Sequence, residues 1–590
     1  MPPYEYRPLT PPRAFRLFNL VAGGEKDPVK GTLAEYDLEF HSSYESKYSG
    51  YEVKLPSDHV IGVSYVWGKG CPIAEIVVEG CSLYITPSLH SLLTHLRYEH
   101  SHRILWIDQI CIDQDNIEER NAQVREMGRI YQQAETNLVW LGETNLQTEI
   151  AFEALRRIVS SSTNSNISKE ARTITSSEAQ ALRDVFTLNP LWTRVWIIQE
   201  LLLAHKIRLV CGYDHLEWTF VEFICWISAQ KKNATVESLQ ALESNTCPLI
   251  NLCTERDRLR CTRKRPPLPD LLFLFQGQHA SRELDKIYAL LGLAEDVMIR
   301  PDYRKNFRQV CVDTVTSILN YYGHLDFICF DALSCPRRIR SLDLPSWVPD
   351  LHSGFAPLEP AFRTKLYRAS GPIAPHRYPF NISGDIITAK GRQIDYIGDG
   401  QQLCRNRFST PHQYLGFFAS LPFQSPETTN DDLEHWDVVV RTMTVDVADM
   451  GGRLTKQDLP VHRLRFLEWL HALEKLVTTD DTRSLAARQA AWSYLWKGPR
   501  GSRFESKWDR KLILTRRGLL VSCKEGLAGD TIVVLETASV PLILRKTQIL
   551  YGMNEYKIVG TAYVHGFMDG EALAKRNGSD EFPEQVYRIV

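Results

Sequence analysis

The sequence predicts an α/β protein with three parts: an N-terminal parallel-sheet domain of the Rossmannoid type, a mostly helical middle region and a small β-rich C-terminal domain. Apolar runs typical of buried parallel strands alternate with helical periodicity up to about residue 205. Helical patterns then dominate, and short strand patterns with glycine-containing turns fill the last 80 residues. A chain of 590 residues is long enough for several such domains.

Changes in composition and periodicity divide the chain into six expected segments. Residues 160–178 are rich in Ser, Thr and Asn and have no apolar period, so we expect a surface insertion there. The segments are N-terminal lead-in strands at 1–54, the first domain at 55–205, a mostly helical region at 206–350, a proline-rich linker at 351–385, a mixed α/β region at 386–510 and a small β domain at 511–590.

Three apolar runs are the expected parallel strands of the first domain. Residues 60–65 form a strand that ends at Trp67 and Gly68, residues 104–107 end at Asp108, and residues 137–141 end at Gly142. The carboxyl ends of parallel strands meet at one edge of a sheet, where ligands bind. We therefore expect an aromatic side chain, a flexible glycine and a carboxylate to converge there.

Helix signals separate these strands. After a hairpin that turns at Glu79-Gly80, Thr86-Pro87 is expected to start a helix as cap and first residue. Asp115 and Glu118 have the spacing of a capping box before the next helix. Asn189 or Thr193 should begin a third helix that contains Trp196 and Glu200.

Composition argues against several classes of function. The net charge of −2 provides no general attraction to nucleic acid or to anionic membranes. No apolar stretch approaches the ~18–20 residues that span a bilayer, and the N-terminus lacks the apolar core of a secretory signal. The 13 cysteines contain no CxxC pair, so we expect a cytoplasmic protein with reduced thiols and no metal site.

Several motifs together resemble the fungal heterokaryon-incompatibility (HET) domain. They are Ser-Tyr-Val-Trp-Gly at 64–68, Leu-Trp-Ile-Asp-Gln-Ile-Cys-Ile-Asp-Gln at 105–114 with the helix that follows, and Trp-Thr-Arg-Val-Trp-Ile-Ile-Gln-Glu at 192–200. Segments at 285–293, 345–350 and 563–570 resemble those that recur downstream in full-length members. The resemblance implies allorecognition and programmed cell death, with a protein partner or self-association.

A second resemblance concerns the Trp196–Glu200 segment, which is similar to the Trp-x-x-x-Glu helix of Toll/interleukin-receptor (TIR) domains. In active TIR domains the glutamate serves NAD cleavage. The resemblance implies that Glu200 is catalytic and that NAD or a related nucleotide is a substrate, with no separate cofactor. Five residues are expected to bind this ligand: Trp67, Gly68, Asp108, Arg120 and Trp196.

Structural explanations stand beside each of these assignments. The tryptophans could be core aromatics, and Asp108 could cap the turn after its strand. Glu200 could pair with Arg194, and Arg120 could pair with Asp108. The segment after Gly68 is not a glycine-rich phosphate loop, so a pyrophosphate would need Lys69 or Arg120 as a donor. A non-enzymatic signalling module that acts by oligomerisation or partner binding is therefore the alternative function.

Overall fold

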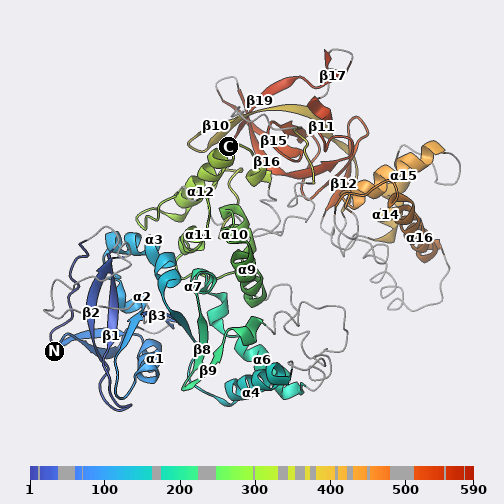
Figure 1. The fold of residues 1–590 in the computed structure, drawn as a ribbon. Helices are drawn as coiled ribbons and strands as arrows, with labels where there is room; N and C mark the ends of the chain where they lie inside the picture. Colours follow the sequence, from blue (N-terminus) through green and yellow to red (C-terminus); the bar gives the residue numbers. More distant parts are fainter. Residues whose placement is uncertain are drawn as a thin grey trace. The chain divides into compact units, whose positions relative to one another are not determined.

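The computed structural model divides the chain into two compact units, Met1–Phe307 and Arg308–Val590, and Figure 1 labels their elements. Each unit is described below by itself. The residues that the structure describes are 1–10, 14–37, 60–68, 71–161, 174–222, 248–296, 299–329, 343–352, 366–371, 380–404, 410–421, 430–447, 452–478, 510–550, 553–573, 575–576 and 579–590.

A mixed β-sheet organises the first unit (Figure 1). Among the described residues it has nine strands in the order β5-β4-β2-β1-β6-β3-β7-β8-β9. The strands are β1 (Ala14–Leu20), β2 (Lys30–Asp37), β3 (Val60–Ser64), β4 (Ala74–Val78), β5 (Cys81–Ile85), β6 (Arg103–Trp106), β7 (Thr136–Trp140), β8 (Ile207–Cys211) and β9 (Asp214–Glu217).

Four central strands, β6, β3, β7 and β8, run parallel, which agrees with the three predicted strands. The predicted parallel sheet is thus confirmed in part, and the whole sheet is mixed, because β1 pairs antiparallel with both β2 and β6, and β9 pairs antiparallel with β8. Short connections join β1 to β2 and β8 to β9, and these permit only antiparallel pairing. The lead-in strand β1 is therefore part of the sheet, and the sheet continues beyond residue 205.

The predicted hairpin and first helix are confirmed. Glu79 and Gly80 have φ values of 52° and 83° between β4 and β5, as a two-residue turn with both central residues left-handed requires. Thr86 caps α1 (Pro87–Leu96) through its side chain, which accepts a hydrogen bond from the Leu89 backbone. The buried leucines of α1 are Leu89, Leu92, Leu93 and Leu96.

Two predicted helix starts need correction. Asn116, not Asp115, caps α3 (Ile117–Gln133), because the Asn116 side chain accepts from the backbone of Glu118 and Glu119. The helix expected to run through Trp196 is interrupted: the 3₁₀ helix η2 (Pro190–Thr193) comes first, and α7 (Ile197–Leu202) starts after it. Arg194 forms a β-bridge with His279 between them, which takes the chain out of helical geometry.

The remaining helices of the first unit follow β6, β7 and β9 in the sequence. They are α2 (Asp108–Cys111), α4 (Leu146–Ser161), α6 (Ser176–Phe186), α9 (Pro248–Thr262), α10 (Leu268–Leu274) and α11 (Asp285–Leu291). Helices α3, α7 and α11 pack against one another. Thr175 caps α6 with a capping box to Glu178, so the end of the predicted insertion is helical, whereas residues 162–173 lie outside the described part.

A closed β-barrel forms the core of the second unit. Its ring is β11-β12-β13-β16-β15-β14, and β14 pairs back onto β11. Strand β19 pairs with β11 and β16, and β10 with β11. The strands are β10 (Phe380–Ser383), β11 (Ile386–Cys404), β12 (Lys511–Thr515), β13 (Leu520–Cys523), β14 (Thr531–Leu535), β15 (Leu542–Leu550), β16 (Met553–Val564) and β19 (Glu584–Ile589).

The short strands predicted in the last 80 residues thus form, but the sheet also recruits β10 and β11. Strand β11 has 19 residues and can pair with β14 through one half and with β12 through the other, because a register shift bends it near Ile397. The predicted linker at 351–385 therefore ends in a strand, β10. Residues 353–365 and 372–379 of that linker lie outside the described part.

Helices lie between the barrel strands β11 and β12 in the sequence. They are α14 (Pro411–Ala419), α15 (Asn430–Met443) and α16 (Leu459–Thr478), and α12 (Phe307–Tyr322) precedes the barrel. The apolar faces of α14, α15 and α16 share one core with the barrel residues Leu403, Leu512 and Leu520. The coarse fold prediction, an N-terminal α/β domain, a helical middle and a C-terminal β domain, is confirmed.

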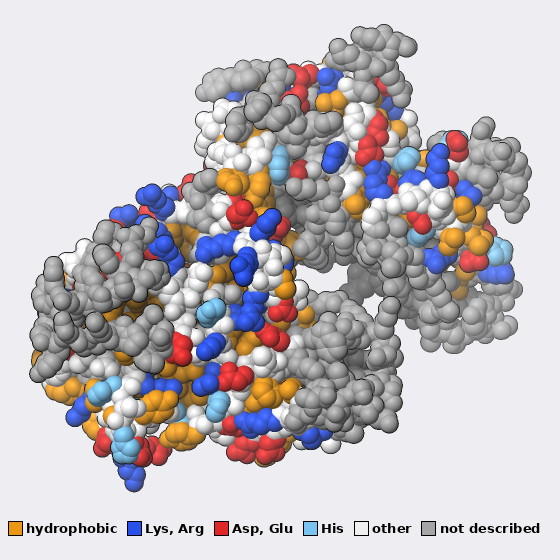
Figure 2. Space-filling model, in the orientation of Figure 1, with side chains coloured by type: hydrophobic (Ala, Val, Ile, Leu, Met, Phe, Trp, Pro, Cys, Tyr) orange, Lys and Arg blue, Asp and Glu red, His pale blue; other side chains and the backbone are white. Residues whose placement is uncertain are grey.

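The surface fits the near-neutral net charge. On the face drawn in Figure 2, acidic and basic side chains are interspersed with apolar ones. Within the described residues, the helices are too short or too polar to cross a membrane.

Candidate functional site

Trp67 and Asp108, from neighbouring strand ends, are in direct contact. The Trp67 indole N–H donates to both carboxylate oxygens of Asp108, at 3.1 and 3.0 Å. Asp108 opens α2 directly after β6, and the Gln109 backbone N–H donates to its Oδ1 at 2.8 Å. Burial raises the pKa of the Asp108 carboxyl, although the charge of Arg194 and these hydrogen bonds lower it. Asp108 thus does form local turn contacts, but it also fixes an aromatic ring.

Glu200 lies in α7 with a side chain that is almost entirely buried. Its residue exposure is 2%, and its Oε2 atom has no hydrogen-bond partner within the described structure. Burial raises the pKa of Glu200 to about 7, while Arg194 and the Ser64 hydroxyl lower it and the charge of Asp108 raises it further. A carboxyl group in this state exchanges a proton near neutral pH, which is the property required of an acid–base or charge-stabilising group.

Polar residues of β3 and β7 hold the Glu200 segment. The Asn137 side-chain amide donates to Ser64 Oγ and to the Glu200 backbone carbonyl, each at 2.9 Å. Tyr131 donates to the Val63 carbonyl at 3.1 Å. Burial, followed by the charges of Glu200 and Asp108, raises the pKa of Tyr131 well above its usual range. The two acids therefore act on the same buried hydroxyl.

Arg194 provides the positive charge of this cluster. Its Nη1 donates to the Tyr65 backbone carbonyl, and its charge lowers the pKa of both Asp108 and Glu200. In the part of the chain that the structure describes, Arg194 forms no ion pair with Glu200, so the suggested salt bridge is absent there. We call Ser64, Trp67, Asp108, Asn137, Arg194 and Glu200 the acid cluster.

Two predicted ligand residues lie outside the acid cluster. The Trp196 indole hydrogen-bonds Asp285, and Tyr303 donates to the same carboxylate at 2.6 Å. Arg120 stacks over the Tyr303 ring, with its guanidinium carbon 4.6 Å from the ring centre. Arg120 does not pair with Asp108; its Nη1 donates to the Gln114 carbonyl at 3.1 Å. Trp196 and Glu200 thus have separate partners although they are four residues apart.

Gly68 adjoins the acid cluster at the surface. It is exposed and has a φ of 80°, and an added Cβ would meet nothing within 4 Å. The left-handed backbone, rather than lack of space, therefore explains a glycine here. Lys69, the suggested phosphate donor, lies outside the described residues.

Sequence reasoning missed most of the polar members of the acid cluster. Asn137 was placed inside an apolar strand, and Ser64 was part of a motif without a role. A signal was available for Asn137, because an amide in the middle of a buried strand needs partners from neighbouring elements. Arg194 was considered only as a salt-bridge partner.

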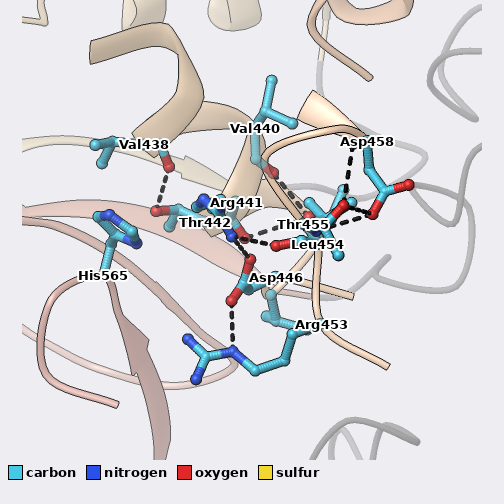
Figure 3. Close-up of polar contacts among 12 residues, drawn as sticks. Val438, Val440, Arg441, Thr442, Asp446, Arg453, Leu454, Thr455, Asp458 and His565 are labelled. Atoms are coloured by element: carbon cyan, nitrogen blue, oxygen red, sulfur yellow. Dashed lines mark hydrogen bonds and ion pairs between the residues drawn. The ribbon is translucent and has the colours of Figure 1, made fainter. Parts of the chain in front are cut away.

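A second buried acid, Asp446, lies in the other unit. Figure 3 shows it between Arg441 and Arg453, after the end of α15. Asp446 is 0% exposed and forms ion pairs with both arginines, at 2.8 Å for Arg453. Arg453 also binds the Asp569 carboxylate at 2.5 Å. Each charge of this network has a partner, so the network has the character of a structural clamp.

Among the described residues, no three His, Cys, Asp or Glu side chains are arranged so that they could hold a metal ion. The acid cluster itself holds two carboxylates and one guanidinium. Such a group can stabilise a developing positive charge or accept a proton.

Comparison with known proteins agrees with this architecture. Residues 61–200, which contain the acid cluster, match the family described as heterokaryon incompatibility protein (HET). Residues 503–583, which include the barrel strands β12 to β16, match the Het-6 beta-barrel domain. No solved structure matches the chain.

A curated relative resembles almost the whole chain. It is heterokaryon incompatibility protein 6, OR allele, of Neurospora crassa, which is 27% identical over 619 residues, covering 88% of this chain and 90% of the relative. The similarity thus includes both units and not only the two matched domains. The chain thus contains a HET domain at residues 61–200 and is similar to heterokaryon incompatibility protein 6 over most of its length.

Proposed function

We propose that this protein acts in heterokaryon incompatibility, as an allorecognition protein that triggers programmed cell death, and that its HET domain hydrolyses NAD or a related nucleotide at the acid cluster. The name of the relative and the two family matches support the biological part. One observation carries the chemical part: Asp108 and Glu200 come from different elements to one cluster, where Glu200 has an unpartnered oxygen and a pKa of about 7.

The proposed reaction breaks the bond between the nicotinamide nitrogen and the ribose C1′. The bonding electrons leave with nicotinamide, so positive charge develops on the ribose. The ionised form of Glu200 stabilises this charge in surroundings poor in water, as a carboxylate does in glycoside hydrolysis. Water then bonds to C1′ and loses a proton to a carboxylate of the acid cluster.

Trp67 and Asp108 have positioning roles in this scheme. The paired hydrogen bonds from the indole to Asp108 fix the plane of the Trp67 ring, which is partly exposed and can stack on a flat ligand ring. The adjacent Gly68 leaves open space on the same surface. Substrate therefore enters from the Trp67–Gly68 side, and the Glu200 side chain must become accessible during the reaction.

The direct test is nicotinamide release from NAD by the purified full-length protein. Glu200→Gln keeps the side-chain shape, and we expect it to lower the rate by about 100-fold or more, the effect of removing a group that stabilises transition-state charge. Glu222→Gln is a matched control, because burial also raises the pKa of Glu222 but its charge partners are Arg256 and Arg260. Absence of release would refute hydrolysis of this substrate, and equal rates in wild type and Glu200→Gln would refute the catalytic role of Glu200.

The second candidate is a non-enzymatic signalling module that acts by oligomerisation or partner binding. The burial of Glu200 favours it, since a side chain with 2% exposure can act as part of the domain core. Expression of the double variant Asp108→Asn, Glu200→Gln in a fungal host separates the two. Loss of cell death with unchanged protein abundance supports hydrolysis, whereas full cell death in the double variant supports the signalling module.

A further inference from the structure

Two arginines share one aromatic ring in the first unit, outside the acid cluster. The guanidinium carbons of Arg120 and Arg282 lie 4.6 and 5.6 Å from the centre of the Tyr303 ring. Arg120 comes from the first turn of α3, and Arg282 lies just before α11. Residues more than 160 positions apart in the sequence are thus brought together.

The Tyr303 ring is held firmly in place. Its hydroxyl donates to Asp285 Oδ1 at 2.6 Å, and its backbone N–H donates to Asn121 Oδ1 at 3.0 Å. Tyr288 packs edge-on against it at 5.3 Å between ring centres. The Tyr303 ring therefore has a fixed position, and both guanidinium groups lie against it.

Neither arginine forms an ion pair within the described residues, and their charges oppose each other. The pKa of Arg120 is lowered by burial and next by the charge of Arg282. Both arginines interact with the charge of Asp285, which Tyr303 and Trp196 already hydrogen-bond. Two guanidiniums that share one buried carboxylate still repel each other, and a bound anion would relieve that repulsion.

Arg120 also has unused donors. Of its five N–H groups the structure uses one, from Nη1 to the Gln114 carbonyl. Its Nε is buried and has no partner among the described atoms. A buried donor without a partner costs stability.

We propose that Arg120 and Arg282 form a binding site for the phosphate group of a small-molecule ligand. A doubly charged phosphate balances two guanidiniums, and its oxygens accept from both arginines at once, whereas a single carboxylate satisfies one guanidinium fork. Arg282 is exposed, so a ligand reaches the site from solvent.

The site adjoins the helix that carries Glu200. Trp196, which hydrogen-bonds Asp285, precedes α7, and its backbone carbonyl accepts from the Glu200 N–H at 3.3 Å. One helical turn, or about 5.4 Å along the axis, thus separates Trp196 from Glu200. The identification of the phosphate as that of a nucleotide rests on the proposed function, but the anion site itself does not.

Binding of inorganic pyrophosphate and of NAD to the full-length protein tests the proposal by isothermal titration calorimetry. In Arg282→Gln we expect both affinities to fall about tenfold or more, the loss expected when one charge-assisted hydrogen bond is removed. Arg304→Gln is the matched control, because Arg304 is also exposed and near Tyr303 but is paired with Asp302 and Glu118; it should bind within about twofold of wild type.

The outcomes separate this proposal from the proposed function. Pyrophosphate binding that Arg282→Gln weakens, without nicotinamide release by the wild type, supports the anion site and refutes hydrolysis. Nicotinamide release without pyrophosphate binding, or pyrophosphate binding equal in wild type and Arg282→Gln, overturns the anion site. Since Arg282 is exposed, circular dichroism should show an unchanged fold in the variant.

Discussion

Glu200 and Asp446 are both buried acids, but their surroundings differ. Asp446 is 0% exposed and lies between two arginines. Glu200 is 2% exposed and leaves one carboxylate oxygen without a partner. A buried carboxylate that is surrounded by cationic partners has a structural role. A buried carboxyl that lacks such partners favours its protonated form and is a candidate catalytic group.

The backbone conformation also differs between the two acids: it is strained at Asp446 and regular at Glu200. Val445 and Asp446 have φ values of 45° and 58°, in the left-handed region that a β-branched residue avoids. Such a conformation costs ~1–3 kcal/mol per residue, so the surrounding contacts must stabilise it. The ion pairs of Asp446 and the hydrogen bond from the Tyr367 hydroxyl to the Val445 carbonyl supply those contacts. Glu200, in contrast, lies in ordinary helix.

Removal of the Asp446 charge should have the largest effect. Asn is tolerated in the left-handed region, so Asp446→Asn removes the charge without changing the backbone preference. It leaves Arg441 and Arg453 facing a neutral group, and we expect the free energy of local unfolding to fall by about 3 kcal/mol. Hydrogen–deuterium exchange of peptides that span α15 and the loop after it measures this change.

The control for this prediction is the exposed end of the same network. The Asp569 side chain is 48% exposed, so Asp569→Asn should cost no more than about 1 kcal/mol. Equal losses in Asp446→Asn and Asp569→Asn would mean that burial does not distinguish the two acids, and the contrast with Glu200 would lose its basis.

The pH dependence of stability should reveal Glu200 with the next largest effect. Its pKa is about 7 in the folded protein instead of the ordinary 4.5, so the folded state binds this proton more tightly than the unfolded chain. Stability of the first unit should therefore rise as pH falls from about 7 toward 4.5. Between pH ~8 and ~5.5 we expect a gain of about 2 kcal/mol from this group.

Glu200→Gln isolates that contribution, because it removes one titration and leaves Asp108 in place. Exchange of the β3 and α7 peptides, compared between wild type and variant at each pH, cancels the intrinsic pH dependence of the exchange rate. The gain in stability at lower pH should appear in wild type and should be absent from Glu200→Gln. Identical pH profiles would show that Glu200 has no raised pKa.

Much of the fold was predictable where local chemistry decides it. The turn at Glu79-Gly80, the cap at Thr86 and the leucine face of α1 depend on residues close in sequence. The sheet neighbours of β1, and the recruitment of β10 and β11 into the barrel, depend on pairings between distant segments. Sequence periodicity contains no information about such partners, so the antiparallel pairing of β1 with β6 could not be predicted.

The candidate site also contains some contacts that the sequence predicts and others that depend on distant segments. The parallel order of β6, β3 and β7 predicted that Trp67 and Asp108 would meet, and they do. The grouping of Trp196 with Glu200 assumed one continuous helix, and Arg120 was added as a possible phosphate donor. The β-bridge of Arg194 with His279 interrupts that helix, and Asp285 and Tyr303, from the later part of the unit, provide other partners. No local pattern in the sequence indicates those contacts.

Asp108→Asn should have the smallest effect on stability, since Asp108 is partly exposed. The amide oxygen can still accept from the Trp67 indole, but the bond loses its charge assistance, and we expect a loss of about 1 kcal/mol. Because the negative charge of Asp108 raises the pKa of Glu200, the variant should also lower that pKa. An unchanged titration of Glu200 in Asp108→Asn would show that the two acids do not interact.

Difference infrared spectroscopy of the carboxyl stretch of Glu200, assigned by subtraction of the Glu200→Gln spectrum, measures the central quantity directly. A midpoint near pH 7 would establish Glu200 as a buried acid that changes protonation at neutral pH. A midpoint near 4.5, its ordinary value, would contradict the account, because the carboxylate would then be as well compensated as that of Asp446.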